Sequence, residues 1–201
     1  MNASRRAHRA TVLIPLLLVP MLLSGCGINN IPTYDEAVNA AWGQVQNQYQ
    51  RRADLVPNLV ETVRGYATQE RETLQAVVEA RAKVSQMNVN ADIINNPEAL
   101  RAFEANQQAL TGALSRLMVV VERYPDLKSN QNFLTLQSQL EGTENRIAVA
   151  RRDYIQAVQR YNTEIRTYPG RIWHSLMYSD MPIRETFEAS AGAEEAPKVQ
   201  F

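Results

Sequence analysis

The sequence has 201 residues, of which 21 are basic and 21 are acidic. This length suits a single domain of ordinary size, and the even balance of charge argues against a nucleic-acid partner, which would favour a basic patch or stripe. The only cysteine is Cys26, which excludes an internal disulfide bond.

The first 25 residues have the pattern of a secretory signal. Arg5, Arg6 and Arg9 precede an apolar run from Val12 to Leu23, which corresponds to the n-region and h-region of such a signal. The run is interrupted by two prolines, and it is shorter than the ~20 residues that a membrane-spanning helix requires. We therefore predict that residues 1–25 form a signal peptide that is removed from the mature protein.

The signal ends in Leu23-Ser24-Gly25-Cys26, which resembles the lipobox of bacterial lipoproteins. Small residues before the cysteine admit the signal peptidase, which would cleave between Gly25 and Cys26, and the thiol of Cys26 would receive a diacylglycerol. The alternative is a buried free thiol, which the position and context of Cys26 disfavour. Each buried methylene of an acyl chain contributes ~0.8 kcal/mol, so several chains would hold the protein on a membrane without a spanning helix.

Charge contributes little to this expected membrane attachment. Loss of the three signal arginines from the 21 basic residues leaves 18 against 21 acidic residues, and a protein with this balance is not drawn to anionic lipid. We expect an extracytoplasmic protein on the periplasmic side, anchored to the cell membrane or the outer membrane. Gly27 is not the aspartate that retains some lipoproteins in the inner membrane, which favours the outer membrane in a two-membrane cell.

Residues 26–32 are expected to form a short tether before the first helix. Thr33 and Glu36 have the spacing of a capping box, which predicts that this helix begins at Thr33. Side chains suited to a buried face then recur every three or four residues. The first series is Val38, Trp42, Val45, Tyr49, Arg52, Val56, Leu59, Val63 and Tyr66, and the pattern continues at Val77, Ala80, Val84 and Met87. Pro57 removes a backbone donor and clashes with the preceding turn, which predicts a kink or a break.

The choice between a kink and a break at Pro57 stays open. The period remains in phase across Pro57, which favours a kink. A straight helix over residues 34–87 would nevertheless be ~80 Å long at 1.5 Å per residue, which favours a sharp bend.

A second helical run follows the polar residues 88–95, which we interpret as a loop. Asn96 is an expected N-cap, followed by Pro97 at the first helical position, and Pro125 is expected to end the helix. The spaced residues of this run are Leu100, Phe103, Gln107, Leu110, Leu114, Leu117, Val121 and Tyr124.

A third run covers residues 127–168 and stops at Tyr168-Pro169-Gly170. Its spaced residues are Phe133, Gln137, Leu140, Glu144, Ile147, Arg151, Tyr154, Val158, Tyr161, Ile165 and Tyr168. No useful length of sequence alternates with period two, so no sheet is expected. The fold class is therefore all-α: an elongated antiparallel bundle over residues 33–168 with three long helical runs, the first kinked or broken near Pro57, giving effectively four helices.

The C-terminal residues divide into two parts. Residues 169–189 contain a cluster that we expect to pack on one end of the bundle: Ile172, Trp173, Leu176, Met177 and Tyr178. Residues 190–201 have no such pattern and are expected to be disordered.

Candidate catalytic and metal-binding residues are few. The mature chain has one histidine, His174, and with Cys26 as the lipid site no Cys-His pair remains for nucleophilic catalysis. The sequence has neither the Glu-x-x-His pairs of di-iron bundles nor the usual zinc ligands. Glu141 and Glu144 lie three residues apart, but glycoside hydrolysis requires a sugar-sized cleft that a narrow bundle does not offer. We predict no catalysis, metal or cofactor.

Charged residues interrupt two of the apolar faces, at Arg52 in the first run and at Glu144 and Arg151 in the third. Arg52 is either a snorkelling side chain that reaches water or a member of a partly buried ion pair. The opposite signs suggest that Arg52 meets Glu144, with Arg51 or Asp54 completing a network. Such a pair would add little net stability, but it would select which helices face each other and in what register.

Two stretches of the chain resemble the LemA family of bacterial membrane-associated helical proteins. The first stretch comprises residues 49–60 (YQRRADLVPNLV), Gly65-Tyr66-Ala67 and Glu79-Ala80-Arg81. The second comprises Phe133, Leu136-Gln137, residues 140–148 (LEGTENRIA) and residues 150–154 (ARRDY). The resemblance extends over residues 33–168, with a weaker match at residues 186–189.

The resemblance to the LemA family implies a helical bundle outside the cytoplasm, without an agreed biochemical activity. We therefore expect a structural or protein-interaction module at the membrane. The alternative is an accessory subunit of a membrane enzyme such as a metalloprotease, since LemA-like proteins are often encoded near such enzymes, or less likely an enzyme itself. The expected contact surface is rich in glutamine: Gln44, Gln46, Gln48, Gln50, Gln107 and Gln108.

Overall fold

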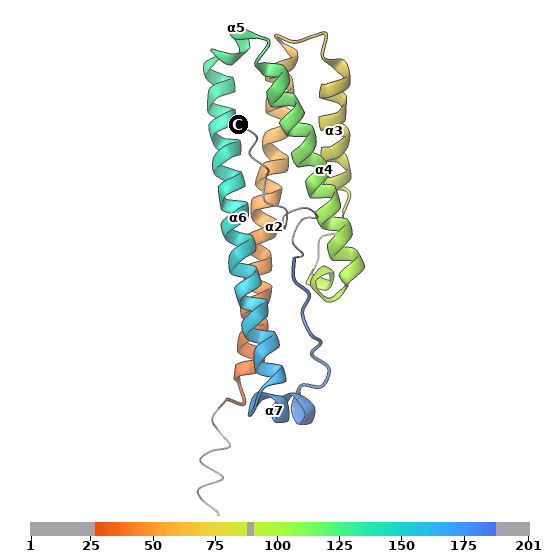
Figure 1. Ribbon diagram of the computed structural model, residues 1–201, viewed down its shortest axis with the longest axis vertical. Helices are drawn as coiled ribbons and strands as arrows, with labels where there is room; N and C mark the ends of the chain where they lie inside the picture. The colour runs from red at the N-terminus through yellow and green to blue at the C-terminus, as the bar shows by residue number, and fades with distance from the viewer. Residues whose placement is uncertain (1–26, 88–90, 188–201) are drawn as a thin grey trace, which may run out of the picture.

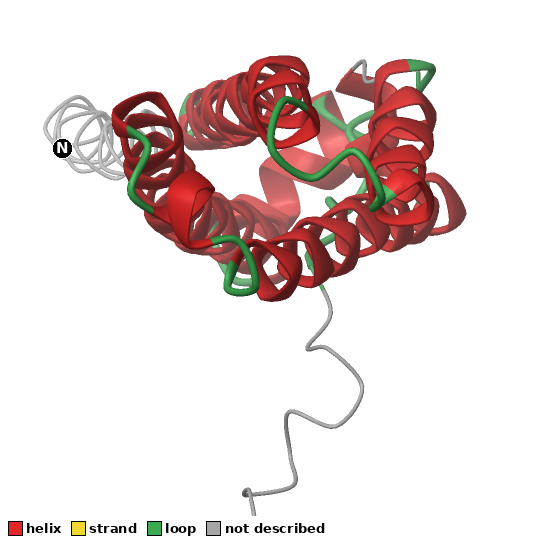
Figure 2. Cartoon of the chain, turned by 90° about the horizontal axis from the view of Figure 1, so that it is seen from above, coloured by secondary structure: helices red, strands yellow, loops and turns green. Residues whose placement is uncertain are grey.

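A computed structural model describes residues 27–87 and 91–187, and helices dominate both parts (Figure 1). The elements are α2 (Asn30–Arg64), α3 (Arg71–Ser85), the 3-10 helix η1 (Ala91–Asn95), α4 (Pro97–Val121), α5 (Pro125–Lys128), α6 (Gln131–Arg166) and α7 (Gly170–Met177). The described residues contain no strand, as Figure 2 also shows. The prediction of an all-α protein is confirmed.

The long helices form an antiparallel bundle. In Figure 1, α2 rises from the lower end, α3 descends, α4 rises again and α6 returns to the lower end. The closest packing is between α2 and α6 and between α3 and α4, and α2 also contacts α3. Because α3 is much shorter than α2 and α6, η1 and the residues after α7 cover the lower part of the bundle.

The first helix begins before the predicted capping box. It starts at Asn30, and the Thr33 hydroxyl donates to the main-chain oxygen of Asn29 at 2.7 Å instead of capping an amide. Pro32 has no amide hydrogen, and the first turn of a helix does not require one. The helix can therefore begin ahead of the proline, and the predicted start at Thr33 is wrong.

The first helical run divides at residues 65–70 and not near Pro57. Helix α2 continues through Pro57 to Arg64, and α3 begins only at Arg71. Since Pro57 has no N–H, the carbonyl of Ala53 loses its helical donor. The Nε of Arg81 on α3 donates to that oxygen at 3.0 Å, which satisfies the carbonyl that the proline leaves free.

Two asparagines cap the later helices. The side chain of Asn96 accepts hydrogen bonds from the amides of Glu98 and Ala99 at the start of α4, which confirms the predicted cap. Asn130 caps α6 in the same way. The third run therefore begins at Gln131 and not near residue 127, because the proline that ends the preceding run starts the short helix α5.

Two hydrophobic clusters fill the bundle. The upper cluster joins α2, α3, α4 and α6, and its larger members are Val56, Leu59, Leu74, Leu110, Leu117, Phe133 and Leu140. The lower cluster is rich in aromatic residues: Ile31, Trp42, Tyr49, Phe103, Ile147, Tyr154, Tyr161 and Phe187. Most of the predicted spaced residues are buried in these clusters, but Tyr66 and Tyr168 are exposed because each follows the end of its helix.

The C-terminal segment packs only in part as predicted. Trp173 and Tyr178 pack on the lower cluster, but Ile172, Leu176 and Met177 are exposed. The prediction that all five of these residues pack on the bundle is therefore wrong for three of them. Helix α7 presents only one side to the bundle, so its opposite side remains in solvent.

A glycine sets the close approach of α7 to α6. A Cβ atom on Gly170 would overlap with the main-chain oxygen of Glu164, far inside van der Waals contact. Only glycine therefore allows the chain to turn this tightly after α6.

Candidate functional site: three arginine contacts and a polar groove

Arg52 lies at the centre of the bundle, where it joins three helices. Its side chain is 2% exposed, and its Nη1 donates to Glu144 Oε1 at 2.9 Å and to Thr111 Oγ1 at 2.9 Å. Its Nη2 donates to Gln107 Oε1 at 2.5 Å and to the main-chain oxygen of Gln107 at 3.2 Å. The structure thus brings Arg52 and Glu144 together, with acceptors from α4 that the sequence did not indicate.

The neighbours that the sequence proposed for this network do not join it. Arg51 is exposed on the outer side of α2, and Asp54 accepts a hydrogen bond from Gln50 at 2.8 Å. Gln107 completes the network instead. The sequence placed it both among the spaced residues of its helix and on the glutamine-rich surface, and the structure buries it. Gln107 is 4% exposed, because it lies on the same side of α4 as the buried Phe103 and Leu110, four residues before it and three after it.

The Arg52 contacts form a polar layer between the two hydrophobic clusters. Arg52, Gln107 and Glu144 lie at the same height on α2, α4 and α6. The flanking core residues are Tyr49 and Val56 on α2, Phe103 and Leu110 on α4, and Leu140 and Ile147 on α6. A slip of α2 by a turn would take the buried guanidinium away from its acceptors on both α4 and α6, so this layer opposes other registers of α2.

Arg151 forms a second, half-buried contact closer to the lower end of the bundle. Its Nη2 donates to Glu104 Oε1 on α4 at 3.0 Å, and its Nη1 donates to the Tyr49 hydroxyl on α2 at 3.1 Å. The guanidinium also lies over the ring of Phe187, with 3.9 Å from Cζ to the ring centroid. Arg151 therefore pairs with Glu104 and not with Glu144 of its own helix.

The sequence reasoning missed a third contact of this kind, between Arg184 and Asp35. Arg184 is 8% exposed, and its Nε and Nη2 donate to Asp35 Oδ1 at 2.9 and 2.5 Å. Asn95 accepts a further hydrogen bond from Arg184, and Asn162 exchanges two hydrogen bonds with its main chain. One signal was available, because Asp35 lies three residues before Val38 and is in phase with the first apolar face.

Two buried tyrosines hold the same C-terminal segment. The Tyr154 hydroxyl donates to the main-chain oxygen of Glu185 at 2.5 Å, and the Tyr161 hydroxyl donates to that of Pro182 at 2.9 Å. Burial raises the pKa of Tyr154 well above its usual range. Burial, together with the nearby negative charge of Asp35, raises the pKa of Tyr161 to about 12. Both hydroxyls therefore remain protonated donors at neutral pH.

A polar groove opens where α3 ends, between α2 and α4. Its volume is about 320 Å³, which lies near the lower limit for small-molecule pockets. The lining residues are Gln46, Asn47, Tyr49, Gln50, Val84, Ser85, Met87, Phe103 and Gln107. The lining combines the amide side chains of four residues with the aromatic rings of Tyr49 and Phe103.

Metal-binding and nucleophilic groups are sparse in the described part of the chain. No group of three or more His, Cys, Asp or Glu side chains there is arranged to hold a metal ion. His174 interacts through Nε2 with the main-chain oxygen of Met181 at 2.8 Å. Gly25 and Cys26, the predicted cleavage and lipidation positions, lie outside the described residues. No helix among the described residues is long and apolar enough to cross a membrane.

These features define an all-helical bundle module whose polar interior is built from arginine contacts between helices. The sequence model of the LemA family matches residues 41–201, and the chain belongs to this family. The match continues beyond Tyr168, where the resemblance in the sequence became weak. The LemA family is not a known enzyme family.

Two curated relatives show how far the similarity extends. Magnetosome protein MamQ 2 of Paramagnetospirillum magneticum is 27% identical over 166 residues, which cover 75% of this chain and 60% of the relative. Protein LemA of Metamycoplasma hominis is 24% identical over 140 residues, which cover 70% of this chain and 60% of the relative. The matched region thus spans about 60% of the length of these relatives.

Proposed function

We propose that this protein is a lipid-anchored, extracytoplasmic member of the LemA family that acts as a protein-interaction module at the membrane. In this proposal the acyl chains on Cys26 attach it to the cell membrane or the outer membrane. The helical bundle then presents its sides to a protein partner. The role is binding, and no reaction is assigned to the bundle.

The observation that carries the proposal is the position of Gly27. This residue directly follows Cys26, and it lies at the lower end of the bundle, where a Cβ on Gly27 would contact the Pro169 ring at 3.7 Å. Asn30 at the start of α2 donates to Glu164 near the end of α6 at 3.2 Å, which fixes this end. An acylated Cys26 would therefore leave the whole length of the bundle free to extend from the membrane.

The polar groove supports a protein partner. Its amide side chains can donate and accept hydrogen bonds, as the backbone of a bound polypeptide requires. Tyr49 and Phe103 add apolar area to its lining, and aromatic residues are enriched in protein interfaces. The hydrogen bond from Arg52 on α2 to Gln107 on α4 joins the two helices beside the groove, which supports a preformed binding surface.

Lipidation is tested by labelling cells with a radioactive fatty acid. The wild-type protein should incorporate the label, and Cys26→Ala should lose both the label and the partition into a detergent phase. A protein that retains residues 1–25 after purification would show that this segment is an uncleaved anchor, and the lipoprotein proposal would be wrong.

The partner surface is tested with a photo-crosslinking amino acid in intact cells. Asn47 is exposed and lines the groove, whereas Ala105 is exposed on the outer side of α4 at a similar height. A partner should crosslink through position 47 and not through position 105. Recovery of a membrane metalloprotease would identify an accessory role. Equal crosslinking at both positions would exclude the groove as the specific contact.

A further inference from the structure

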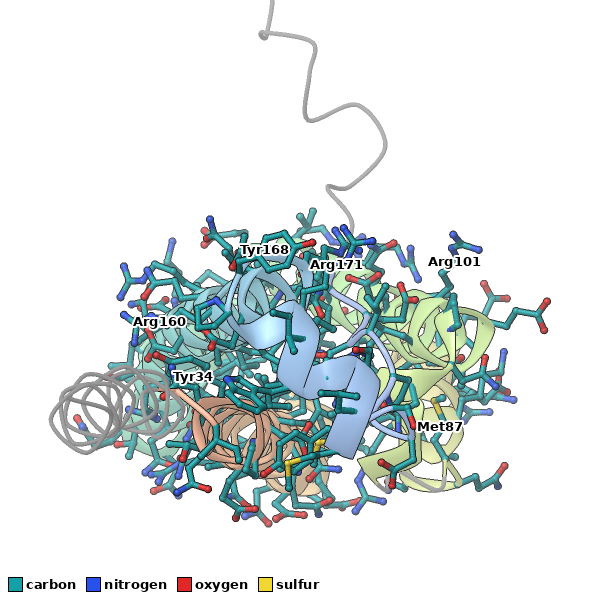
Figure 3. All side chains as sticks on the ribbon, turned by 90° about the horizontal axis from the view of Figure 1, so that it is seen from below. Tyr34, Met87, Arg101, Arg160, Tyr168 and Arg171 are labelled. Atoms are coloured by element: carbon teal, nitrogen blue, oxygen red, sulfur yellow. The ribbon has the colours of Figure 1, made fainter. Side chains whose placement is uncertain are left out.

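An apolar surface covers the lower end of the bundle. It consists of Tyr168, Ile172, Leu176 and Met177, each of which is exposed. Figure 3 views the bundle from this end and shows α7 lying across it, with Tyr168 and Arg171 at the start of the helix. Ile172 and Leu176 are four residues apart and therefore occupy the same side of α7.

Contacts on one side of α7 fix its orientation, so the exposure of its apolar side is a consequence of the fold. On the opposite side, Trp173 packs on the lower cluster, and His174 interacts with the main-chain oxygen of Met181 at 2.8 Å. Gly170 contacts the backbone of Glu164 so closely that no side chain fits. These contacts orient Ile172 and Leu176 away from the bundle.

We propose that α7 is a second membrane contact, whose apolar side enters the interfacial region of the bilayer that holds the acyl chains of Cys26. This inference rests on the proposed lipid anchor. Cys26 directly precedes Gly27 in the chain, and consecutive Cα atoms are about 3.8 Å apart. Gly27 itself adjoins Pro169, the residue before α7. The acyl chains and α7 must therefore meet the same bilayer.

The chemistry of α7 matches that of interfacial helices. Such helices lie in the plane of the membrane with the apolar side buried by about 5–10 Å. Tyrosine is enriched at the level of the headgroups, and an arginine there can place its stem in the apolar region and its charge in water. Tyr168 and Arg171 lie together at the start of α7, at one end of the apolar surface.

The second contact would orient the bundle. A lipid on a flexible tether allows the protein to tilt, whereas a lipid together with α7 holds the end of the bundle flat on the membrane. Helix α2 has 35 residues and is about 52 Å long at 1.5 Å per residue, so the α2–α3 turn would be held at that order of distance from the bilayer. The acyl chains still supply the attachment, since the apolar surface of α7 is small.

The inference is tested on the full lipidated protein in vesicles of phosphatidylcholine and phosphatidylglycerol. An environment-sensitive NBD fluorophore is attached at Leu176→Cys. The control is Val119→Cys, near the last residue of α4 and therefore at the upper end of the bundle. The two side chains are matched, because each is 71% exposed. Acylation blocks the thiol of Cys26, so only the introduced cysteine is labelled.

The expected result is a blue-shifted emission at position 176 that doxyl-labelled lipid quenches, with neither effect at position 119. Equal, water-like emission at both positions in a protein that carries the fatty acid would overturn the contact of α7 and leave the anchor intact. A blue shift without quenching by lipid would indicate a second copy on this surface and would also overturn it. Loss of the fatty-acid label from the wild type would refute the anchor, and the inference with it.

Discussion

Replacement of Arg52 by methionine is expected to be among the most destabilising changes in the bundle. The substitution leaves the side-chain oxygen of Gln107, which is 4% exposed, without the donor at 2.5 Å. It also removes the guanidinium from above the Tyr49 ring, 5.0 Å from the centroid. A buried polar group without a partner costs roughly 1–3 kcal/mol, and loss of one member of a buried pair costs roughly 3–5 kcal/mol. We expect Arg52→Met to lower the free energy of unfolding by about 3 kcal/mol.

Loss of Glu144 should cost less, because the two partners are not equally buried. The Glu144 side chain is 41% exposed, and a carboxylate at this exposure is partly screened by water. In Glu144→Leu, Arg52 remains charged but keeps its contacts with Gln107 and Thr111. Loss of one member of a buried pair costs roughly 3–5 kcal/mol, and the neutral acceptors lower the expected loss of folding free energy for Glu144→Leu to about 1–2 kcal/mol.

Urea unfolding of the chain that begins at Gly27 provides the measurement, with both single variants and the double variant. Residues in contact should show a coupling energy of about 0.5–3 kcal/mol. Arg51→Met is the matched control, since Arg51 is the neighbouring arginine and is exposed. The reasoning is refuted if Arg52→Met costs no more than Arg51→Met, or if the two single losses add without coupling.

Three further predictions concern other contacts. Arg81→Met should destabilise the bundle by roughly 1–2 kcal/mol, because the Ala53 carbonyl loses its donor. Most of this loss should vanish in a Pro57→Ala background, where the helical N–H returns. An equal loss of stability in both backgrounds would contradict this prediction. The pKa of Tyr161 is raised to about 12 in the folded protein and is about 10 in an unfolded chain. The contribution of Tyr161 to the free energy of unfolding should therefore be fully present below pH 10 and be lost as the pH rises toward 12. Tyr161→Phe should make the fall shallower in urea titrations at each pH, and an unchanged slope would count against the argument. Gly170→Ala should displace α7, which a shift of the Trp173 fluorescence would report, whereas Gly43→Ala should have little effect because no atom lies within 4 Å of its added Cβ.

Much of the bundle could be predicted from local sequence patterns. The spacing from Val45 to Val63 identifies the buried side of α2, because burial of one helical face depends only on the period of the apolar residues. The Asn96 cap was predictable for a similar reason, since a cap acts on amides two and three residues away. The opposite charges of Arg52 and Glu144 on two apolar faces also indicated a pair, because a buried charge requires a partner.

The continuity of α2, by contrast, was decided by tertiary structure. Pro57 predicts a kink or a break when only its own helix is considered. The donor that satisfies the Ala53 carbonyl comes from Arg81 on α3, 28 residues further along the chain, and no local signal reports such a contact.

The partners of Arg151 and Arg184 were also decided by tertiary structure. Glu104 and Asp35 lie 47 and 149 residues from them in the chain, and which acidic residue meets which arginine depends on the relative height of the helices. The sequence by itself determined that this protein folds as helices with buried faces, because that depends on periods of three and four residues. Only the packed bundle determined which charges meet and which apolar side of α7 remains exposed, because those outcomes depend on distances between residues that are remote in the chain.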